Sequence, residues 1–301
     1  MTFQEKHDLP YGGACDCHVH VVGPQPQFSQ VAARSYTAGP ATLESLRAVA
    51  QPLGVSRYVL VQPSFYGMDN TCLLETLDTL KENGRGVVVL DPAAVSTRQL
   101  KELAARGVCG VRVNLYSKVS PLAQAGLENV LQRFMALLPR DGWHIEVIAT
   151  LPAIVAAASA IRRSTLPIVI DHYGVPEDSL PESEMGRGLL DVLCLPHVWI
   201  KLSAPYRVVR HSAATIPPVA WLAAFLGAAP DRCVWGSDWP HTPPRKEQRD
   251  ADITIPYRNI DYRRLLTDFL AALPPGSLAE RILISNPARL YGFDPAESSR
   301  A

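Results

Sequence analysis

The chain has 301 residues, of which 47% are hydrophobic and 19% charged, so it can bury a large core and is not intrinsically disordered. Lys and Arg together number 29, as do Asp and Glu, so the formal net charge is zero. Domains that coat nucleic acid or an anionic membrane are usually strongly basic, so this balance argues against both partners.

No targeting segment or membrane span is predicted. Residues 1–13 are polar, and the longest apolar stretch, 147–161, is interrupted by polar residues and proline. The six cysteines form no C-x-x-C pair and mostly lie in apolar runs. This usage predicts reduced, buried thiols in a cytoplasmic protein.

Short runs rich in Val, Ile and aromatic residues alternate along the chain with helical patterns. The predicted strands are 14–21, 58–62, 87–90, 110–114, 144–148, 168–171, 198–202 and 233–237. The predicted helices are 42–52, 69–83, 96–106, 126–138, 151–163, 184–193, 218–226 and 262–273, with a last helix, 278–284, leading into 286–291. This alternation predicts a (β/α)8 TIM barrel over about 14–293, in a single domain spanning 1–301. A doubly wound open sheet would need a Gly-rich turn after its first strand, which the chain lacks.

Chemically capable side chains lie at the end of every predicted strand. In chain order they are Asp16, His18 and His20; Gln62 and Ser64; Asp91; Arg112 and Asn114; Glu146; Asp171 and His172; Lys201 and Ser203; and Ser237 and Asp238. Barrel active sites lie where strands end, so we expect these residues to converge on one face. The loop 22–41 should lie at the same mouth.

The run 15–22 carries the strongest single signal. Strand alternation predicts Asp16, His18 and His20 on one face and the two cysteines on the other. Two imidazoles placed in this way can bind one metal ion or one carbonyl oxygen. Two histidines buried in the core, with their hydrogen bonds satisfied, remain an alternative. A Cys/His zinc knuckle is disfavoured, because alternation places the sulfurs and the imidazoles on opposite faces of the strand.

Asp238 lies between Trp235 and Trp239 near the last strand end. We expect this carboxylate to be partly desolvated, which would raise its basicity. An Asx turn before Pro240 is the structural alternative.

These motifs resemble the amidohydrolase superfamily, in its amidohydrolase-2 group, and within it the lactonases of 2-pyrone-4,6-dicarboxylate. The matching stretches are 15–20, 62–67 with Asp69 and Asn70, 110–114, 171–174, 199–207, 233–240 and 286–293. The resemblance implies a hydrolase that opens a carboxylated lactone during the degradation of aromatic compounds. A small anionic lactone is the implied partner, and the oligomeric state is not predicted.

The resemblance also implies individual roles. His18, His20 and His172 would polarise the lactone carbonyl, and Asp238 would be the general base for water. Substrate carboxylates would be held by Ser64, Arg112 and Arg207, with Tyr36 as a further candidate. Lys118 falls where the lactonases have a second basic residue. Because Lys cannot replace Arg as a bidentate clamp, a sulfonated lactone remains an alternative substrate.

The expected cofactor is none. Arg112 and Glu146 lie where many amidohydrolases have a carbamylated Lys and a His, and a guanidinium is a poor target for carbamylation. This argues against a binuclear centre. One Zn²⁺ or Mn²⁺ remains an alternative, with ligands His18, His20, His172, Asp238 and, as an added oxygen ligand, Glu146. Two rival functions remain open: a metal-dependent decarboxylase of the same group and a non-catalytic binder of an anionic metabolite.

Overall fold

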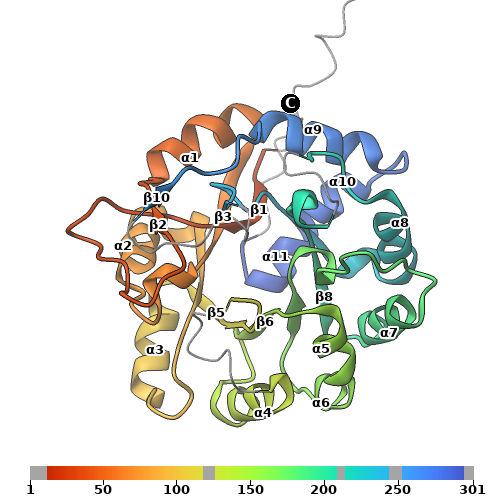
Figure 1. The fold of residues 1–301 in the computed structure, drawn as a ribbon, viewed down its shortest axis with the longest axis horizontal. Helices are drawn as coiled ribbons and strands as arrows, with labels where there is room; N and C mark the ends of the chain where they lie inside the picture. The colour runs from red at the N-terminus through yellow and green to blue at the C-terminus, as the bar shows by residue number, and fades with distance from the viewer. Residues whose placement is uncertain (1–11, 118–125, 209–213, 244–252, 295–301) are drawn as a thin grey trace, which may run out of the picture.

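The computed structural model describes residues 12–117, 126–208, 214–243 and 253–294. Eight parallel strands form one sheet in the order β1-β3-β4-β5-β6-β7-β8-β9 (Figure 1). Their bounds are β1 Ala14–Val19, β3 Val55–Val61, β4 Gly84–Val88, β5 Val108–Asn114, β6 His144–Ile148, β7 Ile168–Ile170, β8 Val198–Ser203 and β9 Cys233–Gly236. A parallel bridge between Val19 and Trp239 brings the last strand back to the first. The predicted TIM barrel is therefore confirmed.

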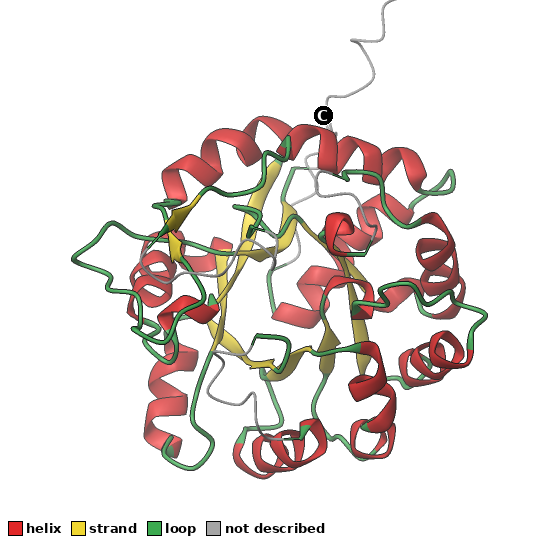
Figure 2. Cartoon of the chain, in the orientation of Figure 1, coloured by secondary structure: helices red, strands yellow, loops and turns green. Residues whose placement is uncertain are grey.

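Most of the helices lie around the outside of the strands (Figure 2). The helices are α1 Leu43–Ala50, α2 Thr71–Leu80, α3 Thr97–Ala105, α4 Leu127–Leu137, α5 Leu151–Ala156, α6 Ala158–Arg162, α7 Glu184–Leu193, α8 Val219–Ala228, α9 Tyr262–Ala272, α10 Leu278–Glu280 and α11 Asn286–Tyr291. The predicted helix 151–163 is wrong in one respect, because Ala157, with ψ near 5°, separates α5 from α6. None of the described helices is long and apolar enough to cross a membrane.

Two apolar layers hold the barrel together. The outer layer packs strand residues such as Leu60 and Ile200 under the helices. A separate inner cluster joins Cys15, Cys17 and other strand residues to Tyr291 of α11, which lies inside the ring of strands in Figure 1. All six cysteines are free, and Cys194 differs from the prediction because it is exposed.

The pairing of β1 with β3 shifts register inside the histidine motif. Asp16 pairs with Tyr58 and Val19 with Leu60, so three steps along β1 match two along β3. Such a bulge breaks the alternation of faces. Asp16 consequently lies on the helix side, where its carboxylate accepts hydrogen bonds from the Tyr262 hydroxyl of α9 at 2.8 Å and the Ser237 backbone N–H at 2.8 Å. The prediction that Asp16 shares a face with His18 and His20 is wrong for this reason.

Burial raises the pKa of Asp16 to about 6, against the lowering effect of its hydrogen bonds. A raised pKa in the folded state stabilises the fold at low pH, and this contribution is lost as pH rises from about 4 through about 6. We therefore expect the difference in free energy of unfolding between Asp16→Asn and the wild type to change by about 2 kcal/mol in favour of the variant when the pH is raised from 4 to 7.5. Urea unfolding at both pH values measures the difference. The exposed Asp141→Asn is the control, and equal differences at both pH values for Asp16→Asn would contradict the expectation.

Candidate functional site

The Asp238 carboxylate lies at the centre of the site. It follows β9 in the left-handed backbone region, with φ of 60°, and is fully buried. Its Oδ2 accepts hydrogen bonds from the Tyr206 hydroxyl at 2.7 Å and from Arg207 Nε at 2.9 Å. Its Oδ1 faces the Nε2 atoms of His20 at 3.3 Å, His18 at 3.6 Å and His172 at 3.9 Å. Oδ1 is therefore the oxygen that can accept a proton from a bound water.

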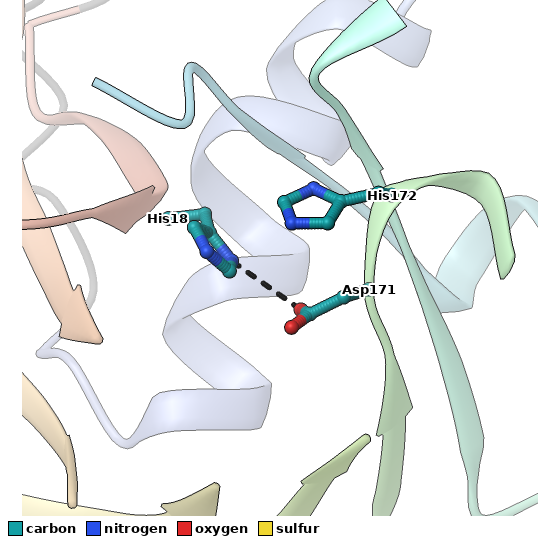
Figure 3. A group of neighbouring side chains, drawn as sticks. All are labelled: His18, Asp171 and His172. Carbon is teal, nitrogen blue, oxygen red and sulfur yellow. Dashed lines mark ion pairs between the residues drawn. The ribbon is translucent and has the colours of Figure 1, made fainter. Parts of the chain in front are cut away.

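The three predicted histidines come from two sides of the barrel. His18 is on β1 and His20 follows it, whereas His172 opens the 3₁₀ turn His172–Gly174 after β7. The ring centroid of His18 lies 5.0 Å from that of His20 and 4.6 Å from that of His172. Figure 3 shows the His18 and His172 rings close together, with the Asp171 carboxylate below them. The structure thus brings all four predicted catalytic side chains together.

Hydrogen bonds at Nδ1 distinguish the histidines. The Nδ1 atom of His20 lies 2.7 Å from the Val61 carbonyl oxygen, which can only accept, so neutral His20 carries its proton there. Its Nε2 lies 3.3 Å from Asp238 Oδ1, which is also an acceptor, so a hydrogen bond there requires a proton on Nε2. The Nδ1 atom of His172 lies 2.9 Å from the Ser203 hydroxyl, which can donate or accept. Both ring nitrogens of His20 therefore face acceptor oxygens, whereas the Nε2 atoms of His18 and His172 have no hydrogen-bond partner in the described structure.

Burial and nearby cations set the charges. Burial and, secondarily, Lys201 hold the pKa of His18 well below its usual value, and burial does the same for His172. Burial alone would raise the pKa of Asp238, but Arg207, His172 and the other imidazoles hold it well below the usual range. The expectation that desolvation between two Trp residues raises the basicity of Asp238 is therefore wrong, because a guanidinium contacts the carboxylate directly.

Lys201 lies at the centre of a buried cluster of charged side chains next to the histidines. No role was predicted for it from the sequence. It extends from β8, is fully buried, and donates a short hydrogen bond to Glu146 Oε2. Its Nζ also lies 3.1 Å from His18 Nδ1 and 3.5 Å from Asp171 Oδ1. Glu146, considered above as an added metal ligand, is therefore paired with Lys201. The sequence feature that could have revealed this role is a lysine between Ile200 and Leu202 in an otherwise apolar strand.

A pocket of about 630 Å³ reaches the site at His20 and Arg207, both of which contact Asp238, whereas Asp238, His18 and His172 lie behind its wall, fully buried. Five predicted residues line it, namely His20, Tyr36, Ser64, Arg112 and Arg207. Asn114, Tyr116 and Thr242 also line it, and no role was predicted for them. One guanidinium nitrogen of Arg112 donates to the Gln62 carbonyl at 2.6 Å, which orients the side chain in the wall. Lys118 lies outside the described residues.

Two loops are joined at the mouth of this pocket. The strand β2 (Thr37–Ala38) pairs in parallel with β10 (Thr254–Ile255), and the Tyr257 hydroxyl donates to the Gly39 carbonyl at 2.5 Å. The loop after β1 is thereby held to the segment that follows β9. Tyr36, next to β2, packs edge-on against Phe65 with ring centroids 5.9 Å apart. This contact places Tyr36 on the pocket wall.

The side-chain types of the site are also those that bind metal ions. Ligand atoms of His18, His20 and Asp238 lie within 4.8 Å of one another, as do those of His18, Asp171 and His172. Within the described part of the chain, the Nε2 atoms of His18 and His172 have no hydrogen-bond partner. Imidazole nitrogen and carboxylate oxygen are ligands that Zn²⁺ and Mn²⁺ accept. Glu146, by contrast, is already neutralised by Lys201.

Comparisons with known proteins identify the family of the chain. A family model described as Amidohydrolase matches residues 15–293. The chain is 31% identical over 287 residues to a 4-sulfomuconolactone hydrolase of Hydrogenophaga intermedia, covering 93% of this chain and 89% of that protein. It is 28% identical over 295 residues to a 2-pyrone-4,6-dicarboxylate hydrolase of Comamonas testosteroni, covering 93% and 90%. A crystal structure from Agrobacterium tumefaciens, 22% identical, has the same fold, with a TM-score of 0.78 and coverage of 96% of this chain and 98% of that one. The chain belongs to the amidohydrolase family, as its motifs predicted.

Proposed function

We propose that this enzyme hydrolyses a small lactone carrying carboxylate or sulfonate groups, as a step in the degradation of aromatic compounds. Relatives named for hydrolysis of a sulfonated and of a dicarboxylated lactone support this substrate class. The observation that carries the proposal is the position of Asp238, whose Oδ1 faces three imidazoles next to a pocket lined by Arg112 and Arg207.

Substrate binding would use the cations and hydroxyls of the pocket wall. Arg112 and Arg207 supply guanidinium groups, which form paired hydrogen bonds with carboxylates. Ser64 and Tyr36 add hydroxyl donors on the same wall. Lys118 remains a candidate for a further contact. The arrangement of these donors would determine whether the pocket accepts a carboxylated or a sulfonated ring, because the two anionic groups differ in shape.

Ring opening would begin with a water bound beside Asp238 Oδ1. Asp238 takes one proton from this water as the water oxygen attacks the lactone carbonyl carbon, and His20, which contacts the same Oδ1, holds the carboxylate in place. The carbonyl oxygen becomes negative and accepts hydrogen bonds from the imidazoles of His18 and His172. The ring C–O bond then breaks, and Asp238 returns the proton to the departing ring oxygen. A positioned base of this kind contributes roughly 10²–10⁴-fold to the rate.

Metal-free catalysis is part of the proposal. Arg207 and Lys201 already place two positive charges at the site, and Arg112 places a third in the pocket wall. In the alternative, one Zn²⁺ or Mn²⁺ held by His18, His20, His172 and Asp238 would polarise the carbonyl as a Lewis acid. A metal-dependent decarboxylase would require such an ion, and the same donor set favours it as the second candidate function.

Exhaustive chelation should leave ring opening intact. We expect the treated enzyme to retain its activity with less than one equivalent of zinc or manganese bound, because donors and cations of the chain itself stabilise the developing charge. Ring opening is followed spectroscopically with a panel of carboxylated and sulfonated lactones, and metal content by elemental analysis. Loss of activity on chelation, recovery with added metal, and stoichiometric metal in the active enzyme would instead establish a metallo-lactonase or a decarboxylase.

A further inference from the structure

The buried ammonium of Lys201 has two hydrogen-bond partners and one longer ion pair. An ammonium group has three N–H donors and no acceptor. Three acceptors surround Nζ: Glu146 Oε2, Asp171 Oδ1 at 3.5 Å, and His18 Nδ1 at 3.1 Å. Burial alone would lower the pKa of Lys201, but the carboxylates of Glu146 and Asp171 raise it above its usual value. Lys201 is thus paired with two carboxylates, and one of its N–H donors points at a ring nitrogen.

This contact decides which nitrogen of His18 carries the proton. A donor at Nδ1 requires a lone pair there, so the proton of the neutral ring must be on Nε2. Asp171 Oδ1 lies 3.3 Å from the same Nδ1 and would favour the opposite tautomer (Figure 3). The 3.1 Å contact with Lys201 lies within the usual hydrogen-bond range, whereas the Asp171 contact is longer than that range.

We propose that Lys201 is a positioning residue that fixes His18 as the Nε2–H tautomer, so that His18 donates to the lactone carbonyl oxygen and is not poised to ligate a metal. The proposal rests on the lactone hydrolysis proposed above. A metal-ligating histidine usually donates its other ring N–H to a carboxylate or carbonyl. Asp171 could provide that acceptor, and Lys201 occupies the position from which it prevents the arrangement.

Replacing Lys201 should therefore invert the tautomer of His18. In Lys201→Met, the Asp171 carboxylate becomes the polar group nearest Nδ1, and the proton should move to Nδ1. The Nε2 lone pair would then face the carbonyl oxygen and repel it. Loss of one donor to a developing oxyanion typically lowers kcat about 10²–10³-fold, so we expect a loss of that size with KM nearly unchanged.

The experiment uses the full chain with ¹⁵N-labelled histidine, after chelation. Long-range ¹H–¹⁵N correlation spectra distinguish a protonated from an unprotonated ring nitrogen, and the His18 signals are those absent from His18→Gln. We expect Nε2–H in the wild type and Nδ1–H in Lys201→Met. The exposed Lys101→Met on α3 is the matched control, and it should change neither the His18 signals nor kcat.

Removing one partner of a buried ion pair is strongly destabilising, so Lys201→Met alone could fail to fold. The double variant Glu146→Gln, Lys201→Met removes both charges of the pair and tests the same tautomer. An Nδ1–H wild type, or an unchanged Nε2–H tautomer in the variants, would overturn the proposal and leave Lys201 a purely structural counter-ion. The spectra require no substrate, so a wild type that opens no lactone would refute the proposed function separately.

Discussion

Asp238→Asn should lower the rate of lactone hydrolysis by about 10²-fold or more and leave substrate binding largely intact. An amide has nearly the volume of a carboxylate but cannot take a proton from water. Its carbonyl oxygen can still accept the hydrogen bonds from Tyr206 and Arg207 that hold Oδ2 in the wild type. The pocket wall should therefore keep its shape while the base is lost.

Turnover by ring-opening spectroscopy and binding by calorimetry with an unreactive carboxylated analogue measure the two effects separately. The exposed Asp191→Asn on α7 is the control for a carboxylate-to-amide change elsewhere in the barrel. If Asp238→Asn kept more than about a tenth of wild-type turnover, the base would have to be another group, with Glu146 or His172 next in line. The pairing of Glu146 with Lys201 makes it the weaker of those two.

Arg112→Ala and Arg207→Ala should each raise KM at least ~10-fold, because each removes a charge-assisted contact worth about 1.5–3 kcal/mol. Steady-state kinetics on the best lactone of the panel give KM and kcat for both variants. Arg98→Ala, whose side chain is 83% exposed on α3, is the control for loss of a guanidinium.

The two variants should differ in kcat. Arg112 contacts a backbone carbonyl in the pocket wall, so its loss should act mainly on binding. Arg207 also holds Asp238 Oδ2, with its second nitrogen at 2.8 Å, so its loss should change kcat as well. Unchanged KM for both variants would show that these guanidinium groups are structural and would remove the main support for an anionic substrate.

The order and number of the strands were predictable from the sequence because they depend on local patterns. A run such as 144–148 is apolar enough to be buried and is bounded by residues that end strands, so its limits agree with β6. The polar residues at the strand ends were equally predictable, because a polar residue directly after an apolar run can be identified from the local sequence alone. The match to the amidohydrolase family likewise follows from motifs contiguous in the sequence.

The tertiary structure alone decided which side chains of the site meet. Alternation places Asp16 beside His18, but the register of β1 is set by its pairing with β3, and a bulge there turns Asp16 toward α9. The contacts of Lys201 with Glu146 and His18 join residues 55 and 183 positions apart. A local pattern cannot contain such pairs, because they exist only once the barrel closes and removes these charges from water. The same closure brings Arg207 onto Asp238 and reverses the direction of its expected pKa shift.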